Sequence, residues 1–197
     1  MSAPRLILGS TSPYRSALLA RLGLPFETSA PEIDESPLQG ETALDLTQRL
    51  ARTKAQQVAR QTGWADAIVV AADQSAALGT AALGKPGNFA AALAQLQSCQ
   101  GRSVIFYTAT TVLDCSRGTT WHDVDTTEVR FRNRSDEQLS HYIERERPYD
   151  CAGGFKVEGL GISLFEAVET RDPTALIGLP LIWLTGVLGE LGLDPLL

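Results

Sequence analysis

The sequence predicts an α/β fold organised around a mixed β-sheet, and three observations lead to that expectation. Residues 5–9 and 67–72 are short apolar runs of the kind that form buried strands. Residues 103–113 and 119–131 are rich in Val, Thr, Tyr and Phe, which favour strands. Helical segments separate these runs without a regular alternation, so we expect a sheet with both parallel and antiparallel pairs.

The helices of the first half are predicted from their starts. Residues 13–22 follow Ser12, a good N-cap, and begin with proline, which is favoured at the first helical position. A longer amphipathic helix is expected over residues 42–61, where apolar side chains recur every three or four positions. Residues 88–98 form a third helix, which Asn88 can cap.

The second half should contain a long hairpin, two further helices and one further strand. Residues 115–118, Cys-Ser-Arg-Gly, form the turn between the two long strands. A helix follows over residues 135–144, opened by a serine. The Gly-rich passage 151–161 leads to a strand near residues 162–167, and an apolar helix after Pro180 closes the chain.

Length and composition describe an ordinary globular protein. The chain has 197 residues, of which 44% are hydrophobic and 20% charged, enough for one sizeable core. No Gly/Ser linker, low-complexity tract or long internal repeat divides it. We therefore expect a single domain over residues 1–197, either as one unit or as two lobes around a cleft.

The charge balance and the hydropathy argue against two classes of partner. A net charge of −6 disfavours a nucleic-acid surface, because such surfaces are basic. A small phosphorylated ligand stays open if a local basic cluster or a metal ion offsets the acidic background. The apolar stretch 175–188 is too short to span a bilayer and contains Pro180, so we expect a buried helix and no membrane role.

Cysteine usage and the N-terminus indicate the cytoplasm. Cys99, Cys115 and Cys151 are odd in number and far apart, with no CxxC pair or neighbouring His that would indicate zinc. They are expected to be free thiols in a reducing compartment. Residues 1–8 lack the long apolar core and the cleavage site of an export signal.

The first strand–helix junction is a candidate phosphate-binding loop. The N–H groups and the positive dipole end of a helix N-terminus attract phosphate. Ser10, Ser12 and Arg15 can add hydroxyl and guanidinium contacts there. The plainer interpretation is a capped helix with a solvated Arg, and on this segment alone it is the stronger one.

Two charged residues stand beside apolar ones. Lys54 lies in the helical row of Leu50 and Val58, where its ammonium group either reaches solvent or crosses to an anion or carboxylate in a cleft. Asp73 follows the buried run 67–72, and ligand crevices in open α/β sheets lie outside such strand ends. A cap or turn role for Asp73 is equally supported.

An acidic loop and a basic turn complete the candidates. Glu32, Asp34 and Glu35 offer hard oxygen ligands that suit Mg²⁺ or Mn²⁺, although acidic loops are usually solvated surface. Lys85 lies in the turn Gly-Lys-Pro at residues 84–86, which is weak by itself.

Taken in this order, these segments resemble the Maf-like nucleotide pyrophosphatases over nearly the whole chain. Each motif is weak alone, but the ordered set is specific. The matching segments are the small-Ser-x-Ser-Pro-x-Arg loop at 9–15, Asp-Glu at 34–35, Lys-Ala at 54–55, Asp73 after an apolar strand, Gly-Lys-Pro at 84–86, a Leu and Gly segment leading into a long strand at 96–108, Pro-x-Asp-x-Ala-Gly at 148–153 and Gly-Leu-Pro at 178–180.

The resemblance implies a Maf/inosine-triphosphatase-like fold, with a mixed sheet, helices on both sides and a central nucleotide cleft. It also implies hydrolysis of a nucleoside triphosphate to the monophosphate and pyrophosphate, with a divalent metal cation such as Mg²⁺ or Mn²⁺. Asp73 would be the general base for water attacking the α-phosphorus, and Glu35 would bind the metal. The triphosphate would be held by Ser10, Ser12, Arg15, Lys54 and Lys85.

Four positions depart from the commoner family pattern. Tyr14, Gln74, Cys151 and Glu158 stand where commoner members have Arg, Thr, Lys and Gln, and they resemble the subgroup that hydrolyses 7-methyl-GTP. The methylated base is positively charged, so an aromatic face from Tyr14 is worth more to it than to a neutral base. Glu158 could accept from the donors of the guanine edge, and Gln74 could add an amide contact.

Two other functions stay open at this point. One is a pyrophosphatase of the same family for dTTP, UTP or CTP, and the other is a non-catalytic regulator that senses a nucleotide in the same cleft. The expected partner is in each case a small-molecule nucleotide, and a homodimer is also left open.

Overall fold

The computed structural model describes residues 4–197; residues 1–3, the start of the segment on which the export expectation rests, lie outside the described residues. A seven-stranded sheet runs through the molecule in the order β2-β1-β3-β5-β6-β7, and β4 pairs with β3 off this path. The pairs of β1 with β2 and with β3 are parallel and the others antiparallel, as the mixed-sheet prediction requires. The strands are β1 (Arg5–Leu8), β2 (Phe26–Thr28), β3 (Ala67–Leu78), β4 (Ala81–Leu83), β5 (Ser103–Asp114), β6 (Thr119–Phe131) and β7 (Phe165–Glu169).

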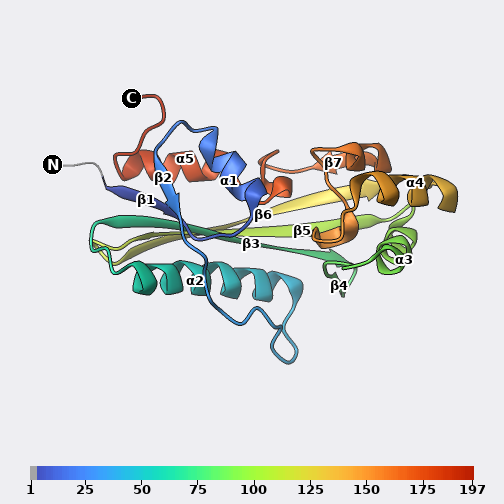
Figure 1. The fold of residues 1–197 in the computed structure, drawn as a ribbon, viewed down its shortest axis with the longest axis horizontal. Coiled ribbons are helices and arrows are strands. Elements are labelled where there is room, and N and C mark those ends of the chain that lie inside the picture. Colours follow the sequence, from blue (N-terminus) through green and yellow to red (C-terminus); the bar gives the residue numbers. More distant parts are fainter. Residues whose placement is uncertain (1–3) are drawn as a thin grey trace.

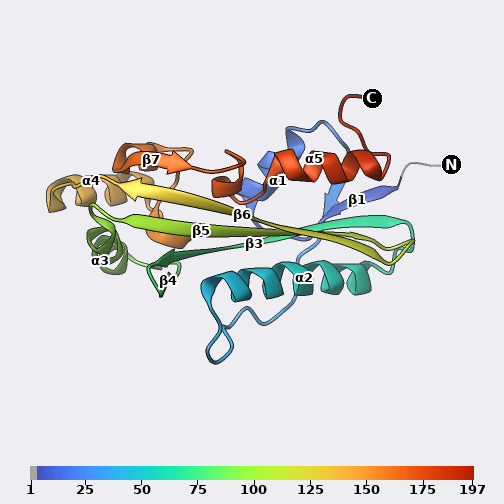
Figure 2. The ribbon, with the colours of Figure 1, turned by 180° about the vertical axis from the view of Figure 1, so that it is seen from behind.

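Helices cover both faces of this sheet. Figures 1 and 2 show α2 along one face, α1 and α5 along the other, and α3 and α4 at the end of the sheet where β7 lies. The helices are α1 (Pro13–Ala20), α2 (Ala43–Thr62), α3 (Phe89–Cys99), α4 (Asp136–Glu146) and α5 (Leu181–Glu190), with short 3-10 turns η1 (Ala152–Gly154), η2 (Leu160–Leu164) and η3 (Ala175–Ile177). Within residues 4–197, no helix has both the length and the apolarity needed to cross a membrane.

The helix starts predicted from capping residues are confirmed. Ser12 and Asn88 each accept a hydrogen bond from a backbone N–H in the first turn of the helix that follows. Thr42, which was expected inside α2 rather than as its cap, does the same for that helix. Ser135 forms a full capping box with Gln138. These side chains satisfy N–H groups that a helix leaves without an internal partner, which is why sequence alone locates them.

The prediction that β3 ends just before Asp73 was wrong. Strand β3 continues to Leu78, so Asp73 lies within it. The parallel partner β1 stops at Leu8, opposite Val70, but the antiparallel partner β5 pairs with β3 as far as Ala77. The space beside Asp73 is therefore created by the short length of β1, because β3 extends past the end of its neighbour.

Other boundaries also differ from the prediction. The strand expected near residues 162–167 begins only at Phe165, because residues 160–164 form the 3-10 turn η2 before pairing with β6 starts. Strands β2 and β4 were not predicted, since three residues are too few to show a period of two.

The core consists of three apolar clusters around the sheet. Leu6 and Leu8 of β1 face a cluster that includes α1 and α5, while Ile7 faces a smaller one under α2. The alternation of side chains along a strand sends neighbours to opposite faces. In the third cluster, which includes residues of α3, α4 and β7, four phenylalanine rings pack edge to face with centroid distances of 4.6 to 5.7 Å: Phe106, Phe131, Phe155 and Phe165.

Candidate functional site

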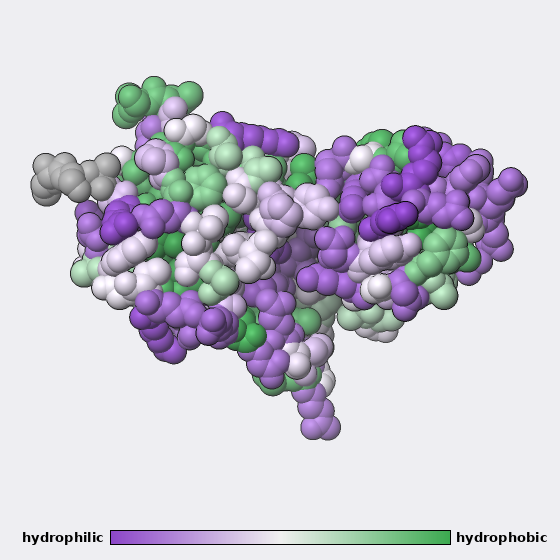
Figure 3. All heavy atoms as spheres, in the orientation of Figure 1, coloured by the Kyte–Doolittle hydropathy of each residue, from purple (hydrophilic) through white to green (hydrophobic). Residues whose placement is uncertain are grey.

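A cavity of about 620 Å³ lies where β3 extends beyond the end of β1. Figure 3 shows the molecule hollowed between the half that contains α1 and α5 and the half that contains α3, α4 and β7. Segments between residues 9 and 177 line this cavity, and they include most of the candidate side chains: Ser10, Ser12, Tyr14, Arg15, Glu35, Lys54, Asp73, Gln74, Lys85, Cys151 and Glu158. Glu32 and Asp34, the other two acidic candidates, do not line it.

The loop between β1 and α1 is held by its own hydroxyl groups. Ser10 Oγ accepts from the backbone N–H of Ser12 at 3.1 Å, and Ser12 Oγ accepts from that of Arg15 at 3.4 Å. Both oxygens act as acceptors in these bonds, so each hydroxyl hydrogen remains available to a ligand. Gly9 allows the loop to pass close to α2, because a Cβ there would lie 3.1 Å from Val58 Cγ2.

Arg15 is anchored from the opposite end of the sequence. Its Nε donates to Gly178 O at 3.0 Å; Arg15 lines the cavity, and so does Ile177, the residue before Gly178. Gly178 has a φ of +126°, and a Cβ there would lie 3.3 Å from Arg15 Nε, so a larger residue would crowd the guanidinium group. Burial lowers the pKa of Arg15 while Asp73 and Glu35 oppose the shift, and the guanidinium stays charged at neutral pH.

Lys54 joins two carboxylates inside the cavity. Its Nζ lies 2.7 Å from Asp73 Oδ1 and 2.8 Å from Glu35 Oε1. The side chains of Lys54 and Asp73 are 6% and 9% exposed, whereas that of Glu35 is 53% exposed. Of the two alternatives for Lys54, solvent or a carboxylate in a cleft, the second is observed, and without a substrate its ammonium group is occupied by these two anions.

Glu35 is held beside Lys54 by the loop that precedes α2. Arg49 forms a double hydrogen bond with Glu41, with Nε to Oε1 at 2.6 Å and a terminal nitrogen to Oε2 at 2.8 Å. It also donates to Ser36 O at 3.0 Å, next to Glu35. Sequence reasoning missed Arg49 and Glu41, because their spacing of eight residues across a loop–helix boundary follows no helical or strand period.

The pKa of Glu35 reflects its position among cations. Burial raises this pKa, but the hydrogen bond and the charge of Lys54, with smaller contributions from Lys85 and Arg15, outweigh burial and lower it. Glu35 is consequently ionised at neutral pH. An ionised, partly exposed carboxylate beside a phosphate-binding loop is a hard oxygen donor that a metal ion can reach.

The residues present fit a Mg²⁺ or Mn²⁺ ion that shares its ligands with a substrate. Within residues 4–197, no three His, Cys, Asp or Glu side chains form a group that could hold a metal by themselves. Mg²⁺ is commonly bound by one or two carboxylates together with substrate phosphates rather than by a complete protein cage. Glu35, whose side chain is 53% exposed, supplies a carboxylate of that kind.

A second group of side chains surrounds Tyr14. Burial and the nearby Cys151, Asp150 and Glu158 raise the pKa of Tyr14 to about 12. Burial and Asp150 likewise raise the pKa of Cys151 to about 12, and its Sγ donates to Asp150 Oδ1 at 3.6 Å. Tyr14 and Cys151 are therefore neutral at pH 7, and the charge of this group comes from the exposed carboxylates Asp150 and Glu158.

The cavity thus has two electrostatic regions. In one region, three cations lower the pKa of Glu35: Arg15, Lys54 and Lys85. In the other, the anions Asp150 and Glu158 raise the pKa of Tyr14. The basic region suits phosphate groups. The acidic region suits a cation beside an aromatic ring.

Gln74 lines the cavity, and its amide nitrogen is bound by the protein. Its Nε2 donates to Thr108 Oγ1 at 2.9 Å and lies 3.0 and 3.1 Å from the carbonyl oxygens of Ala175 and Leu176. The amide nitrogen thereby ties β3 to the turn η3, and only the Gln74 carbonyl oxygen remains for a ligand. Sequence reasoning missed Thr108, since a threonine within a strand carries no functional signal.

The model of the family described as "Maf-like protein" matches residues 5–191. The chain is similar to three curated relatives that are each named "7-methyl-GTP pyrophosphatase". The relative from Albidiferax ferrireducens is 52% identical over 185 residues, and the match covers 92% of each chain. The relative from Cupriavidus metallidurans is 52% identical, and the match covers 96% of this chain and 94% of the relative. The relative from Thiobacillus denitrificans is 49% identical, and the match covers 99% of this chain and 96% of the relative.

Among solved structures, the chain is similar to that described as "The structure of the Staphylococcus aureus Ham1 protein". The match has a TM-score of 0.47 and 13% sequence identity, and it covers 80% of this chain and 89% of that chain.

Proposed function

Because this chain belongs to the Maf-like protein family, we propose that it is a nucleotide pyrophosphatase that hydrolyses 7-methyl-GTP to 7-methyl-GMP and pyrophosphate. The relatives at 49% to 52% identity carry that activity in their names. The observation that supports the substrate within this chain is the acidic region around Tyr14.

The charge of the base is the reason for this substrate. The 7-methylguanine ring is cationic, and a cation over the face of an aromatic ring gains about 0.5 to 2 kcal/mol. Neither Asp150 nor Glu158 forms an ion pair with any residue from 4 to 197, so both charges are available to such a ring. An uncharged base would gain less from the same surroundings.

In the proposed reaction, a water oxygen attacks the α-phosphorus while the bond from this phosphorus to the bridging oxygen of the pyrophosphate breaks. Asp73 accepts the proton of the attacking water, and its ion pair with Lys54 keeps the carboxylate beside the basic region. Ser10, Ser12 and Arg15 bind the phosphates, and Lys85 adds positive charge at the cavity wall.

A divalent metal cation held by Glu35 together with phosphate oxygens would neutralise negative charge on the pyrophosphate leaving group. Lys54 contacts Glu35 as well as Asp73, so its ammonium group lies within reach of phosphates bound beside Glu35. Its place in the ion cluster is therefore compatible with a role in substrate binding.

The proposal includes a cellular location and a class of partner. We place the protein in the cytoplasm, supported by the three free thiols of Cys99, Cys115 and Cys151. The partner is a small-molecule nucleotide, and nucleic acid and membrane are not expected as partners.

The test is pyrophosphate release from a panel of 7-methyl-GTP, GTP, UTP, CTP and dTTP, with purified protein and added Mg²⁺ or Mn²⁺. We expect the highest kcat/KM on 7-methyl-GTP, loss of activity with EDTA, and recovery with metal. Faster turnover of UTP, CTP or dTTP would indicate the pyrimidine nucleotide alternative. Binding of a nucleotide without any product under these conditions would indicate the non-catalytic regulator.

A further inference from the structure

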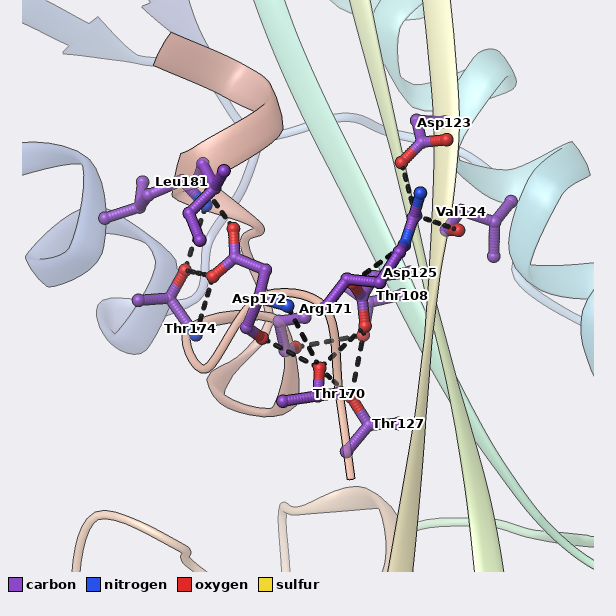
Figure 4. Close-up of polar contacts among 12 residues, drawn as sticks. Thr108, Asp123, Val124, Asp125, Thr127, Thr170, Arg171, Asp172, Thr174 and Leu181 are labelled. Carbon is purple, nitrogen blue, oxygen red and sulfur yellow. Dashed lines mark hydrogen bonds and ion pairs between the residues drawn. The ribbon is translucent and has the colours of Figure 1, made fainter. Parts of the chain in front are cut away.

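Asp172 is a buried carboxylate outside the group of residues assigned above. It lies between β7 and η3 and is 3% exposed. Its Oδ1 accepts from the backbone N–H of Thr174 at 2.8 Å, and its Oδ2 accepts from the backbone N–H of Ile182 at 2.6 Å. Figure 4 shows Asp172 between the loop after β7 and the beginning of α5.

Asp172 acts as a distant cap for α5. The N-cap position of this helix is Pro180, whose side chain makes no capping hydrogen bond. The first-turn N–H of Ile182 is satisfied by Asp172 instead, with the carboxylate at the positive end of the helix dipole. The two oxygens of Asp172 are thus shared between Thr174 and Ile182, which ties the start of α5 to the loop after β7.

Thr174 extends this tie to the other side of the turn. Its Oγ1 lies 2.7 Å from Asp172 Oδ1 and 2.8 Å from Leu179 O, and it accepts from the backbone N–H of Leu181 at 2.9 Å. Its single hydrogen is donated to one of the two acceptors at a time. Asp172 and Thr174 therefore fix both ends of the segment 174–179.

Three carbonyl groups of this segment accept hydrogen bonds from Gln74, Thr108 and Arg15. Ala175 O and Leu176 O accept from Gln74, and Ala175 O also accepts from Thr108 Oγ1 at 3.0 Å. Gly178 O accepts from Arg15 Nε. The position of Gly178 O between the two ends of the segment thus determines where the guanidinium group of Arg15 is held.

The cost of burying Asp172 argues for more than a local turn. Its carboxylate forms no ion pair with any residue from 4 to 197, and all its partners are backbone N–H groups or a hydroxyl. Burying a polar group is costly unless hydrogen bonds satisfy it, and here both oxygens are satisfied. An arrangement of this kind gives a rigid segment with one defined geometry.

We propose that Asp172, acting through Thr174, is a positioning residue that holds Gly178 O and thereby orients Arg15 for the phosphates of the substrate. This inference rests on the proposed function for the part that concerns catalysis. The chain from Asp172 to Arg15 is structural and can be measured without any substrate.

The first experiment observes Arg15 directly by nuclear magnetic resonance. The Nε–H signal of Arg15 is assigned as the one that disappears in Arg15→Gln. In Asp172→Asn and Thr174→Val, which remove an acceptor oxygen and a hydroxyl, we expect this signal to shift or broaden. Thr174→Ser keeps the hydroxyl and should preserve the signal. Thr185→Val, which removes a hydroxyl on the exposed side of α5, is the matched control.

The second experiment is a double-mutant cycle on kcat/KM for 7-methyl-GTP. Thr174→Val should lower kcat/KM on the order of tenfold when Arg15 is present, because small displacements of a binding group are costly. In the Arg15→Gln background, the same change should cost about twofold or less, since coupled residues are not additive. Thermal unfolding of each variant establishes that it is folded.

The outcomes separate this inference from the proposed function. An unchanged Arg15 signal in both folded variants, or losses in kcat/KM that simply add, would overturn the positioning role. If the unaltered protein released no pyrophosphate from any nucleotide, the proposed function would fall, and the Arg15 signal would still decide whether Asp172 and Thr174 place this side chain. If Asp172→Asn does not fold, Thr174→Val and Thr174→Ser carry the test.

Discussion

One ammonium group shared by two carboxylates dominates the chemistry of the cavity at the scale of single residues. Lys54 pairs with a buried Asp73 and an exposed Glu35, so the three groups carry a net charge of about −1 beside the phosphate loop. That excess would repel a triphosphate unless further cations were near. Arg15 and Lys85 line the same cavity, which makes the local balance favourable for anions although the whole chain is acidic.

The first prediction concerns Asp73. In Asp73→Asn the amide cannot accept the proton of the attacking water, so we expect turnover of 7-methyl-GTP to fall about 10² to 10⁴-fold with the fold retained. Initial rates of pyrophosphate release at saturating metal measure this. Asp66→Asn, at an exposed turn before β3, is the control and should retain full activity. Near-normal rates in Asp73→Asn would remove Asp73 from the mechanism.

The second prediction concerns the acidic region around Tyr14. Tyr14→Ala should lower kcat/KM for 7-methyl-GTP by an amount equivalent to about 0.5 to 2 kcal/mol, the range for a cation on an aromatic face. The loss should be smaller for GTP, whose base is neutral. Glu158→Gln should also narrow the preference for the methylated base, because its amide no longer complements the positive charge.

Equal losses on 7-methyl-GTP, GTP and UTP in both variants would contradict this interpretation. Tyr14 and Glu158 would then only shape the cavity. The substrate would have to be sought among nucleoside triphosphates in general.

At the scale of elements, the buried face of α2 carries a single charged residue, Lys54. Leu50 and Val58 pack into the core, and Lys54 stands between them on the same side of the helix. From the sequence alone, replacing Lys54 by Met should be neutral or stabilising, since the apolar row would be completed. The ion pair with Asp73 reverses that expectation, because Met would leave a buried carboxylate without its partner.

We therefore predict that Lys54→Met lowers the free energy of unfolding by about 3 kcal/mol, the lower end of the range for a broken buried pair. Adding Asp73→Asn to it should recover most of this loss, since no unpaired charge then remains. Chemical denaturation of both proteins measures the difference, with Arg52→Met on the exposed face of α2 as the control. Unchanged stability in Lys54→Met would show that water in the cavity already compensates Asp73.

At the scale of the whole molecule, the three long strands β3, β5 and β6 join two halves with separate clusters of the core. Polar side chains reach the sheet at the seam between these clusters, where Asp73, Gln74 and Thr108 lie. Hydrogen bonds from Gln74 and Thr108 to the turn η3 tie the sheet to the C-terminal segment at this seam. The loop that carries Glu35 depends in particular on the pair between Glu41 and Arg49.

The last prediction is that unfolding becomes easier at both ends of the pH range. The hydrogen bonds of Arg49 lower the pKa of Glu41 from 4.5 to about 2. The folded protein therefore binds fewer protons than the unfolded chain in this range, and the stability contributed by Glu41 is complete above about pH 4.5 and lost toward pH 2. Burial raises the pKa of Cys151 from 9.0 to about 12, so its contribution is complete below pH 9 and lost as the pH rises to 12.

The unfolding temperature measured between pH 2 and 12 gives a curve whose acid and alkaline limbs test these two contributions. Glu41→Gln should flatten the acid limb, and Cys151→Ser should flatten the alkaline limb. Glu137→Gln, on the exposed side of α4, should leave both limbs as they are. An acid limb of unchanged steepness in Glu41→Gln would show that other carboxylates control acid unfolding.

The amino-acid sequence by itself determined the longer helices and strands and most of the charged and polar side chains that line the cavity. Caps such as Ser12 and Asn88, and apolar runs such as the one in β3, act through neighbouring residues and leave local patterns. The ordered motifs are also local patterns, and they identified the family. The strands β2 and β4 escaped prediction because they are too short to have a pattern.

Only the tertiary structure decided what those residues do to one another. Arg15 meets Gly178 across 163 positions and Gln74 meets Ala175 across 101, and no local pattern encodes such contacts. The position of Asp73 within β3, the two partners of Lys54 and the buried network of Asp172 likewise depend on which strands pair and where each ends. Contacts of this kind arise from packing of the whole chain, since the free energy that selects them comes from burial and pairing between distant segments.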